Sequence, residues 1–443
     1  MIKTVRDAWQ IPELRRKILF TIFALLIFRL GAAIPVPYIN TAGLETYLSA
    51  QSGTILGLMN AMSGSAFSMA TLFALSIQPY INSSIIIQLL TVAIPALERL
   101  AKEGGEEGRK KIASITRYTT VAIGLIQGFG YYSLINSYGL VETEGLPAVW
   151  VAIVIILSFT AGSAFLMWLG EQITEFGIGN GISVLLFAGI VSRFPHMLRD
   201  MISGIQAYLN PRTEEQLAAM TEVERAAYEN SILAPWMIAV IVVGMLALVV
   251  LIVFISNSER RLPVQYAKRV VGRKMYGGQS THIPIKVNMG GVMPIIFAQS
   301  IAMIPATIGA FAGWTTESGG FGGTLMMLFD TANPFYSVLY FLLIVGFSYF
   351  YATMQFNPVE VANNLKKNGG FIPGFRPGKP TADFIHKVLG KITMFGALYL
   401  ASIAIAPIVT GAILDQGNLA IGGTSIIIVV SVCLLYTSPS PRD

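Results

Sequence analysis

Apolar runs of about 20 residues recur ten times along this chain, and they constrain its fold more than any other feature. A helix of that length crosses the roughly 30 Å hydrocarbon core of a bilayer. Charged residues make up only 12% of the chain, whereas soluble domains contain about 25%. The sequence therefore predicts an all-α, polytopic membrane protein with ten transmembrane helices. The predicted spans are 18–35, 69–96, 115–135, 148–169, 182–209, 233–255, 291–312, 335–352, 392–409 and 419–435.

Lysine and arginine are distributed unevenly between the segments that connect these spans. Ten spans place both termini on one side of the membrane, and the segments on that side hold 24 of the 30 basic residues. Because basic connecting segments remain in the cytoplasm, we expect both termini to be cytoplasmic. The N-terminal run resembles a secretory signal peptide, but its removal would leave nine spans and invert this charge pattern, so we expect a retained first helix.

Two sets of five spans meet at the polar external segment 210–231. An odd number of spans in each half means that the halves enter the membrane from opposite sides, as in inverted-topology repeats, whose working sites lie between the halves. We therefore expect an N-terminal half over 1–209 and a C-terminal half over 232–436. The expectation is topological, because no residue-level repeat relates the two halves.

Titratable side chains are scarce in the predicted spans, which argues against two classes of membrane protein. A secondary transporter of inverted-repeat type would need carboxylates or histidines in broken helices. An intramembrane enzyme would need paired carboxylates, a Ser/His pair or a cluster of metal ligands. The three histidines fall at span ends or in loops, and the acidic residues avoid the apolar runs. We therefore expect no catalytic residue, no cofactor and no metal site, so that another protein would supply any energy.

Five long strings of residues carry a family resemblance. They are RLGAAIPVP (29–37), PYINSSIIIQLL (79–90), GIGNGIS (177–183), YAKRVVGRKMYGGQSTHIPIKVNMGGVMP (266–294) and GGFIPGFRPGKPTADFI (369–385). In this order, and over nearly the whole chain, they resemble the SecY family of translocation channels. The resemblance implies a passive, gated channel in the bacterial plasma membrane that passes unfolded secretory polypeptides outward and releases transmembrane segments sideways into lipid.

The same resemblance implies a set of partners. The small SecE subunit would clamp the two halves together, and SecG would usually join the complex. The SecA ATPase or a translating ribosome would drive transport. Signal sequences and nascent polypeptides would be the molecules recognised and moved, and membrane lipids would surround the channel.

A stretch of small residues at about 54–69, TILGLMNAMSGSAFSM, is too short to cross the bilayer. From the residues alone, it could be an external re-entrant loop. The resemblance implies instead a plug, a short helix that fills the external funnel while the channel is idle. The residues assigned to this plug are Leu58, Asn60, Met62, Ser63, Gly64, Ser65 and Phe67.

Branched aliphatic residues in four of the predicted spans match the pore ring of the family. Ile81 and Ile85 lie one helical turn apart and so share a face, where aliphatic side chains ordinarily face the core or lipid. The resemblance implies instead a constriction that gates by dewetting and closes around a passing chain without binding its sequence. The ring assigned in this way comprises Ile81, Ile85, Leu186, Ile190, Ile296 and Ile428.

Uncharged polar residues near the pore-ring positions suggest a lateral gate, a seam between helices that opens to lipid. Such pairs contribute only about 0.6 to 2 kcal/mol each within membranes, so a signal sequence could separate them. Ordinary helix packing by serine and glutamine is the alternative interpretation. The gate residues implied by the resemblance are Asn82, Ser83, Gln88, Gln299 and Ser300.

Two long basic loops, at about 256–290 and 355–386, are predicted to face the cytoplasm. In the first, RRLPVQYAK and THIPIKVN predict two strands of a ribbon with VVGRKMYGG at its tip. Charge alone would make both loops ordinary positive-inside segments. The resemblance implies docking surfaces for SecA and for ribosomal RNA, whose phosphates bind basic residues in a salt-dependent way. The docking residues are Arg269, Arg273, Lys274, Arg376 and Lys379.

The C-terminal sequence CLLYTSPSPRD departs from the family, whose tenth helix continues into a polar, charged tail. We expect residues 437–443 to be foreign to the native chain, and we assign no role to Cys433.

Overall fold

The described part of the chain forms two compact units. One comprises Met1–Ile241, Met303–Asn333 and Gly411–Ile421, and the other comprises Val242–Ala302, Pro334–Thr410 and Gly422–Asp443. A computed structural model describes residues 9–50, 60, 63–102, 104–143, 145–192, 194–210, 235–266, 269–271, 274–276, 280–312, 314, 320–330, 333–413 and 430.

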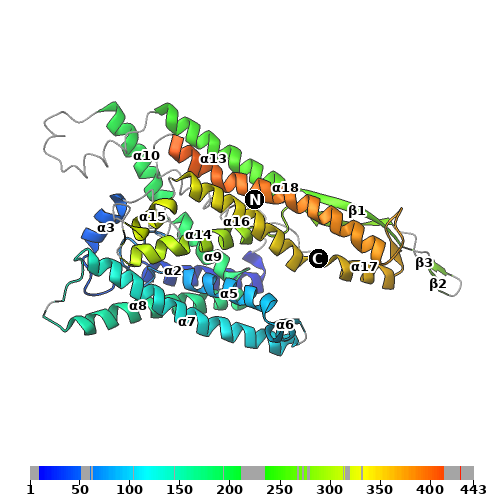
Figure 1. The fold of residues 1–443 in the computed structure, drawn as a ribbon, viewed down its shortest axis with the longest axis horizontal. Coiled ribbons are helices and arrows are strands. Elements are labelled where there is room, and N and C mark those ends of the chain that lie inside the picture. Colours follow the sequence, from blue (N-terminus) through cyan, green and yellow to red (C-terminus); the bar gives the residue numbers. More distant parts are fainter. Residues whose placement is uncertain are drawn as a thin grey trace. The chain divides into compact units, whose positions relative to one another are not determined.

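The first unit is helical, with α7 and α8 lying side by side (Figure 1). Its helices are α2 (Pro12–Gly31), α3 (Thr41–Ala50), α5 (Gln78–Ala93), α6 (Pro95–Lys102), α7 (Gly105–Ser137), α8 (Ala148–Phe176), α9 (Gly181–Val191), α10 (Phe194–Leu209) and α15 (Phe321–Leu328). Small residues allow α7 to approach α8 closely: a Cβ on Gly128 would lie 3.3 Å from the Ile156 carbonyl oxygen. Glycine at a helix contact serves the same purpose in many membrane proteins.

The second predicted span, 69–96, begins later in the structure than the hydropathy indicates. Residues 64–77 form consecutive turns, and α5 starts only at Gln78. At its other end, α5 stops at Ala93, and α6 continues at an angle of 106° to it. The cause of the bend is local, because Ile94 precedes Pro95 and has an extended backbone with a ψ of 112°, the conformation that a following proline favours.

The fifth predicted span, 182–209, is also two helices. Helix α9 ends at Val191 and α10 begins at Phe194. Pro195 lies at the second position of α10, where its missing N–H group is not needed. The apolar composition of 182–209 therefore predicted correctly that these residues are helical, but not that they form two helices.

The second unit joins helices to a small sheet. Its helices α16 (Pro334–Gln355), α17 (Pro358–Lys367) and α18 (Lys379–Ile413) accompany most of α13 (Pro235–Ser256) and the first half of α14 (Met293–Phe311). The Tyr399 hydroxyl donates a hydrogen bond of 3.4 Å from α18 to the Leu251 carbonyl oxygen of α13.

The predicted ribbon is confirmed. Strands β1 (Glu259–Tyr266) and β4 (Ser280–Lys286) pair antiparallel, and β2 (Arg269–Val271) pairs with β3 (Lys274–Tyr276) beyond them. A third strand, β5 (Gly370–Phe371), pairs with the other edge of β1, which gives the order β4-β1-β5. The inward-facing residues of this sheet pack on α17 and α18 in one cluster.

Three helical stretches in the described residues have the length and apolar composition to cross a membrane, and the bent α5–α6 pair would be a fourth. The three are Ala148–Phe176, Pro334–Lys367 and Lys379–Ala406. The tenth predicted span, 419–435, lies outside the described residues except for Val430. The total of ten spans therefore remains a prediction.

Candidate functional site

The predicted plug, where the structure describes it, is a compact turn held by its own polar groups. The Asn60 side-chain oxygen accepts a hydrogen bond of 3.0 Å from the Ser68 N–H, and the Ser63 hydroxyl accepts one of 3.0 Å from the Phe67 N–H. Gly64 and Ser65 both have a positive φ, of 68° and 72°. A left-handed pair interrupts a helix, so residues 64–69 form turns and not the predicted helix. Leu58 and Met62 lie outside the described residues.

Phe67 fastens the end of this segment to the helices beneath it. Its ring stacks on Tyr131 of α7 with centroids 4.3 Å apart, and Tyr131 contacts Phe159 of α8 at 5.0 Å. All three rings are fully buried. The Tyr131 hydroxyl also donates a short hydrogen bond to the Phe67 carbonyl oxygen. The small residues of the plug are therefore followed by a large, well-packed one.

The other side of the plug lies against α9. A Cβ on Gly64 would come within 2.8 Å of the Gly189 carbonyl oxygen and 2.6 Å of the Ser192 hydroxyl. Two constraints therefore require glycine at position 64: the left-handed φ, which a side chain would strain, and this contact, which leaves no space for a Cβ.

The structure places four predicted pore-ring residues on two helices of the first unit. Ile81 and Ile85 are buried on one face of α5, while on α9 Leu186 is buried and Ile190 is half-buried. Ile296 is buried on α14, in the part of that helix that belongs to the second unit. Ile428 lies outside the described residues. The ring as a closed set of six therefore remains a prediction.

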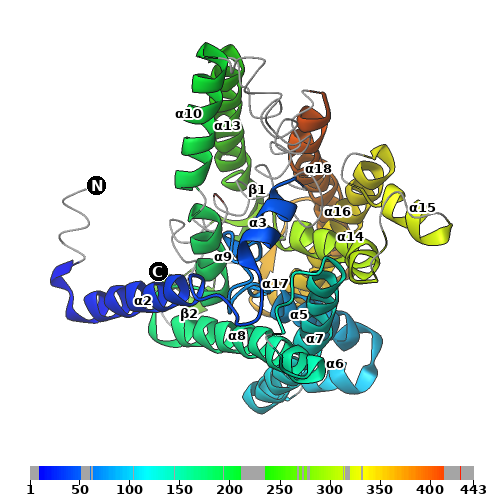
Figure 2. The ribbon, with the colours of Figure 1, turned by 90° about the vertical axis from the view of Figure 1, so that its left-hand side faces the viewer.

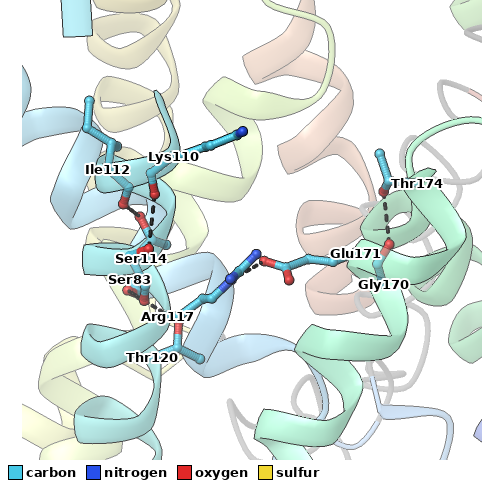
Figure 3. Close-up of polar contacts among 10 residues, drawn as sticks. Ser83, Lys110, Ile112, Ser114, Arg117, Thr120, Gly170, Glu171 and Thr174 are labelled. Atoms are coloured by element: carbon cyan, nitrogen blue, oxygen red, sulfur yellow. Dashed lines mark hydrogen bonds and ion pairs between the residues drawn. The ribbon is translucent and has the colours of Figure 1, made fainter. Parts of the chain in front are cut away.

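The predicted gate residues differ in their surroundings. Ser83 is fully buried, and its hydroxyl donates a hydrogen bond of 2.8 Å to the Thr116 carbonyl oxygen of α7, so it connects two helices of the same unit (Figure 3). The Asn82 side-chain oxygen is buried and has no hydrogen-bond partner among the described residues. Gln88 is exposed, Gln299 is buried and Ser300 is half-buried. Ser83 thus makes an ordinary hydrogen bond between packed helices, whereas the Asn82 side-chain oxygen accepts none from the described residues.

An ion pair that the sequence reasoning missed joins α7 to α8. The Arg117 Nε atom lies 2.9 Å from the Glu171 Oε1 atom, and the dashed line in Figure 3 marks this contact. The side chains are 52% and 28% exposed. A pair this accessible to solvent stabilises the helix contact by at most about 1 kcal/mol. Its two residues are 54 positions apart, which is why no local spacing revealed it.

The loop that carries Arg376 is held in a defined shape. Phe375 stacks on Phe384 of α18 with centroids 4.1 Å apart, and the Thr381 hydroxyl donates a hydrogen bond of 2.8 Å to the Arg376 carbonyl oxygen. The Arg376 and Lys379 side chains are exposed. The backbones of Arg269 and Lys274 lie in β2 and β3, whereas Arg273 lies outside the described residues. The loop therefore presents the exposed side chains of Arg376 and Lys379 from a backbone that is held in place.

Comparison with known proteins gives one consistent result. The SecY family model matches residues 71–437. The protein translocase subunit SecY of Streptomyces galbus is 42% identical, over 98% of this chain and 95% of its own length. The subunit of the same name from Escherichia coli strain K12 is 42% identical, over 95% of this chain and 90% of its own length.

Solved structures show the same fold. A protein-conducting channel covers 98% of this chain and 95% of its own, with a TM-score of 0.62 at 18% identity. The idle yeast Ssh1 complex bound to the yeast 80S ribosome covers 96% of this chain and 89% of its own, with a TM-score of 0.61 at 14% identity.

Proposed function

This chain belongs to the SecY family, and on that premise we propose how its residues form and gate a channel. As a member it is a membrane protein, a protein translocase subunit that conducts polypeptides and is not an enzyme. The single observation that carries this conclusion is 42% identity to SecY subunits over 98% of the chain.

The pore ring is proposed to consist of Ile81, Ile85, Leu186, Ile190, Ile296 and Ile428. A constriction of branched aliphatic side chains excludes water and ions when it is closed, yet it offers no hydrogen bonds that would retain a passing polypeptide. The buried side chains of Ile81, Ile85 and Leu186 are consistent with such a dry constriction.

The plug is proposed to close the external side, with Phe67 as the anchor that holds it while it is seated and that is released when it leaves. The contact of Gly64 with α9 supports this role, because it joins the plug to the helix that carries Leu186 and Ile190. The lateral gate is proposed to use Asn82, whose buried oxygen lacks a partner among the described residues. An unpartnered buried acceptor is costly, so a donor across the gate would stabilise the closed state.

The chain is proposed to cross the bacterial plasma membrane ten times, with both termini cytoplasmic, and to work with SecE and SecG. SecA and the ribosome are proposed to dock on the two basic loops. The exposed side chains of Arg376 and Lys379 support this assignment, as does the ribosome-bound state of the yeast Ssh1 complex.

Reconstitution tests the function directly. The chain, SecE and SecG are placed in liposomes with SecA, ATP and a presecretory protein, and transport is measured as protection of that protein from added protease. We expect protection that depends on ATP and on an intact signal sequence. Protection that is absent although the complex is assembled, or that needs no signal sequence, would contradict the proposal.

A further inference from the structure

We propose that Thr21 on α2 and Thr174 on α8 are positioning residues that fix the start of α9, the helix that carries Leu186 and Ile190. The inference rests on the proposed function, since the role it assigns is to hold part of the pore ring in place. Figure 2 shows the helices involved, and α8 contacts both α2 and α9.

The connection between α8 and α9, residues 177–180, and Gly181, the first residue of α9, lie directly on their neighbours. A Cβ on Gly181 would lie 2.0 Å from the Gly170 carbonyl oxygen, and one on Gly177 would lie 2.7 Å from the Thr21 hydroxyl. Gly179 has a φ of 71°, which glycine adopts without strain. The GIGNGIS string is therefore a close-packed turn whose glycines allow contact with α2 and α8.

The two threonines hold this turn in the same way. The Thr21 hydroxyl donates to the Lys17 carbonyl oxygen at 2.9 Å and accepts from the Ile178 N–H at 3.1 Å. The Thr174 hydroxyl donates to the Gly170 carbonyl oxygen at 2.9 Å, as Figure 3 shows, and accepts from the Gly181 N–H at 2.8 Å. A hydroxyl has one proton, so donation within its own helix turns a lone pair toward the turn.

The N-cap bonds of α9 act within the helix. The Asn180 side-chain oxygen accepts hydrogen bonds from the Ile182 and Ser183 N–H groups at 3.1 Å and 3.3 Å, which is an ordinary N-cap. Both donors belong to the first turn of α9, so these two bonds stabilise the helix but do not tie it to a neighbour. The bonds to Thr21 and Thr174 do tie it, because these residues lie on α2 and α8.

The position of the first residue of α9 matters for the pore ring because the helix is short, with 11 residues. At 1.5 Å per residue, a rotation of about 10° around Gly181 would displace Ile190 by roughly 2 Å. A shift of this size would loosen a closed aliphatic constriction. It would also disturb Gly189, on which Gly64 of the plug lies.

The test replaces Thr21→Val and, separately, Thr174→Val in the full chain reconstituted with SecE and SecG. Valine keeps the branched shape and removes the hydroxyl. We expect the ion conductance of the idle channel, and the export of a substrate with a defective signal sequence, each to rise about fivefold, the factor that corresponds to one typical hydrogen bond. Thr21→Ser and Thr174→Ser should restore wild-type values. Thr119→Val is the matched control, because the Thr119 hydroxyl bonds to Ile115 within its own helix.

A parallel Ile190→Asn variant separates this inference from the proposed function. If Ile190→Asn raises conductance while both valine variants leave it unchanged, the positioning role is wrong and the ring assignment stands. If Ile190→Asn is also without effect, the ring assignment fails and the inference fails with it. If the valine variants reduce complex yield and the export of normal and defective substrates equally, without added conductance, the threonines are merely structural and the inference is wrong.

Discussion

Removal of one oxygen atom, in Tyr131→Phe, tests whether the anchor of the plug keeps the channel closed. The substitution keeps the buried ring and its stacking on Phe67 but deletes the hydroxyl that donates to the Phe67 carbonyl oxygen. That carbonyl, in a fully buried site, then keeps only the hydrogen bond of 3.2 Å from the Ala70 N–H.

The magnitude follows from the lost hydrogen bond. One intramolecular hydrogen bond contributes about 0.5 to 1.5 kcal/mol, and its loss destabilises the seated plug. A loss of about 1 kcal/mol shifts the ratio of seated to displaced plug by roughly fivefold. Phe67→Ala removes the buried ring and its stacking on Tyr131, at about 3 to 5 kcal/mol, so it should shift the ratio further in the same direction.

Conductance across planar bilayers measures the displaced fraction in the absence of substrate. We expect the idle conductance to increase in the order wild type, Tyr131→Phe, Phe67→Ala. Tyr118→Phe on the same helix is the control, since that side chain is 78% exposed. If Tyr131→Phe lowers the melting temperature of the complex but leaves idle conductance unchanged, Phe67 is only part of the core and the reasoning is refuted.

Three further predictions concern the ring, the plug and the docking loop. Ile81→Asn should hydrate the constriction and so increase the export of substrates with defective signal sequences, as measured in export assays. Unchanged export of these substrates would count against the pore ring. Deletion of residues 60–65 should raise ion leakage in planar bilayers, because it removes the contact of Gly64 with α9, and a deletion mutant that stays tight would refute the plug. Arg376→Glu should slow SecA-driven export at least tenfold while the complex still assembles, because one exposed charge is reversed. Lys387→Glu is its control on α18, and equal export rates for wild type and Arg376→Glu would remove the docking role.

Hydropathy predicted where the apolar segments lie but not which of them are continuous helices. Residues 69–77 are as apolar as a helix, yet they form turns. Ala70 and Ser76 have a positive φ, of 43° and 52°, which a right-handed helix does not allow, and the Leu72 N–H donates to the distant Ile34 carbonyl oxygen at 2.9 Å. Local signals did better. Alternating residues predicted β1 and β4. Pro95 was a local signal of the bend between α5 and α6, but it lay inside a span that was predicted to be continuous.

The contacts that organise the candidate site could not be predicted, because their partners are far apart in the sequence. Thr21 and Ile178 are 157 positions apart, and Tyr131 and Phe67 are 64 apart. No spacing rule connects such pairs. The hydrogen bond of Ser83 could not be predicted either. Its residue type and position suggested a gate residue, whereas in the structure its hydroxyl donates to the Thr116 carbonyl oxygen within the first unit.

The pairing of β5 with β1 makes the two basic loops one mechanical element. A load applied near Arg376 reaches Gly370, whose strand is hydrogen-bonded to Gln265 and Tyr266. From β1 the load passes to α13, which ends at Ser256, three residues before the strand begins. A motor or ribosome that pushed on either loop would thus deform both together.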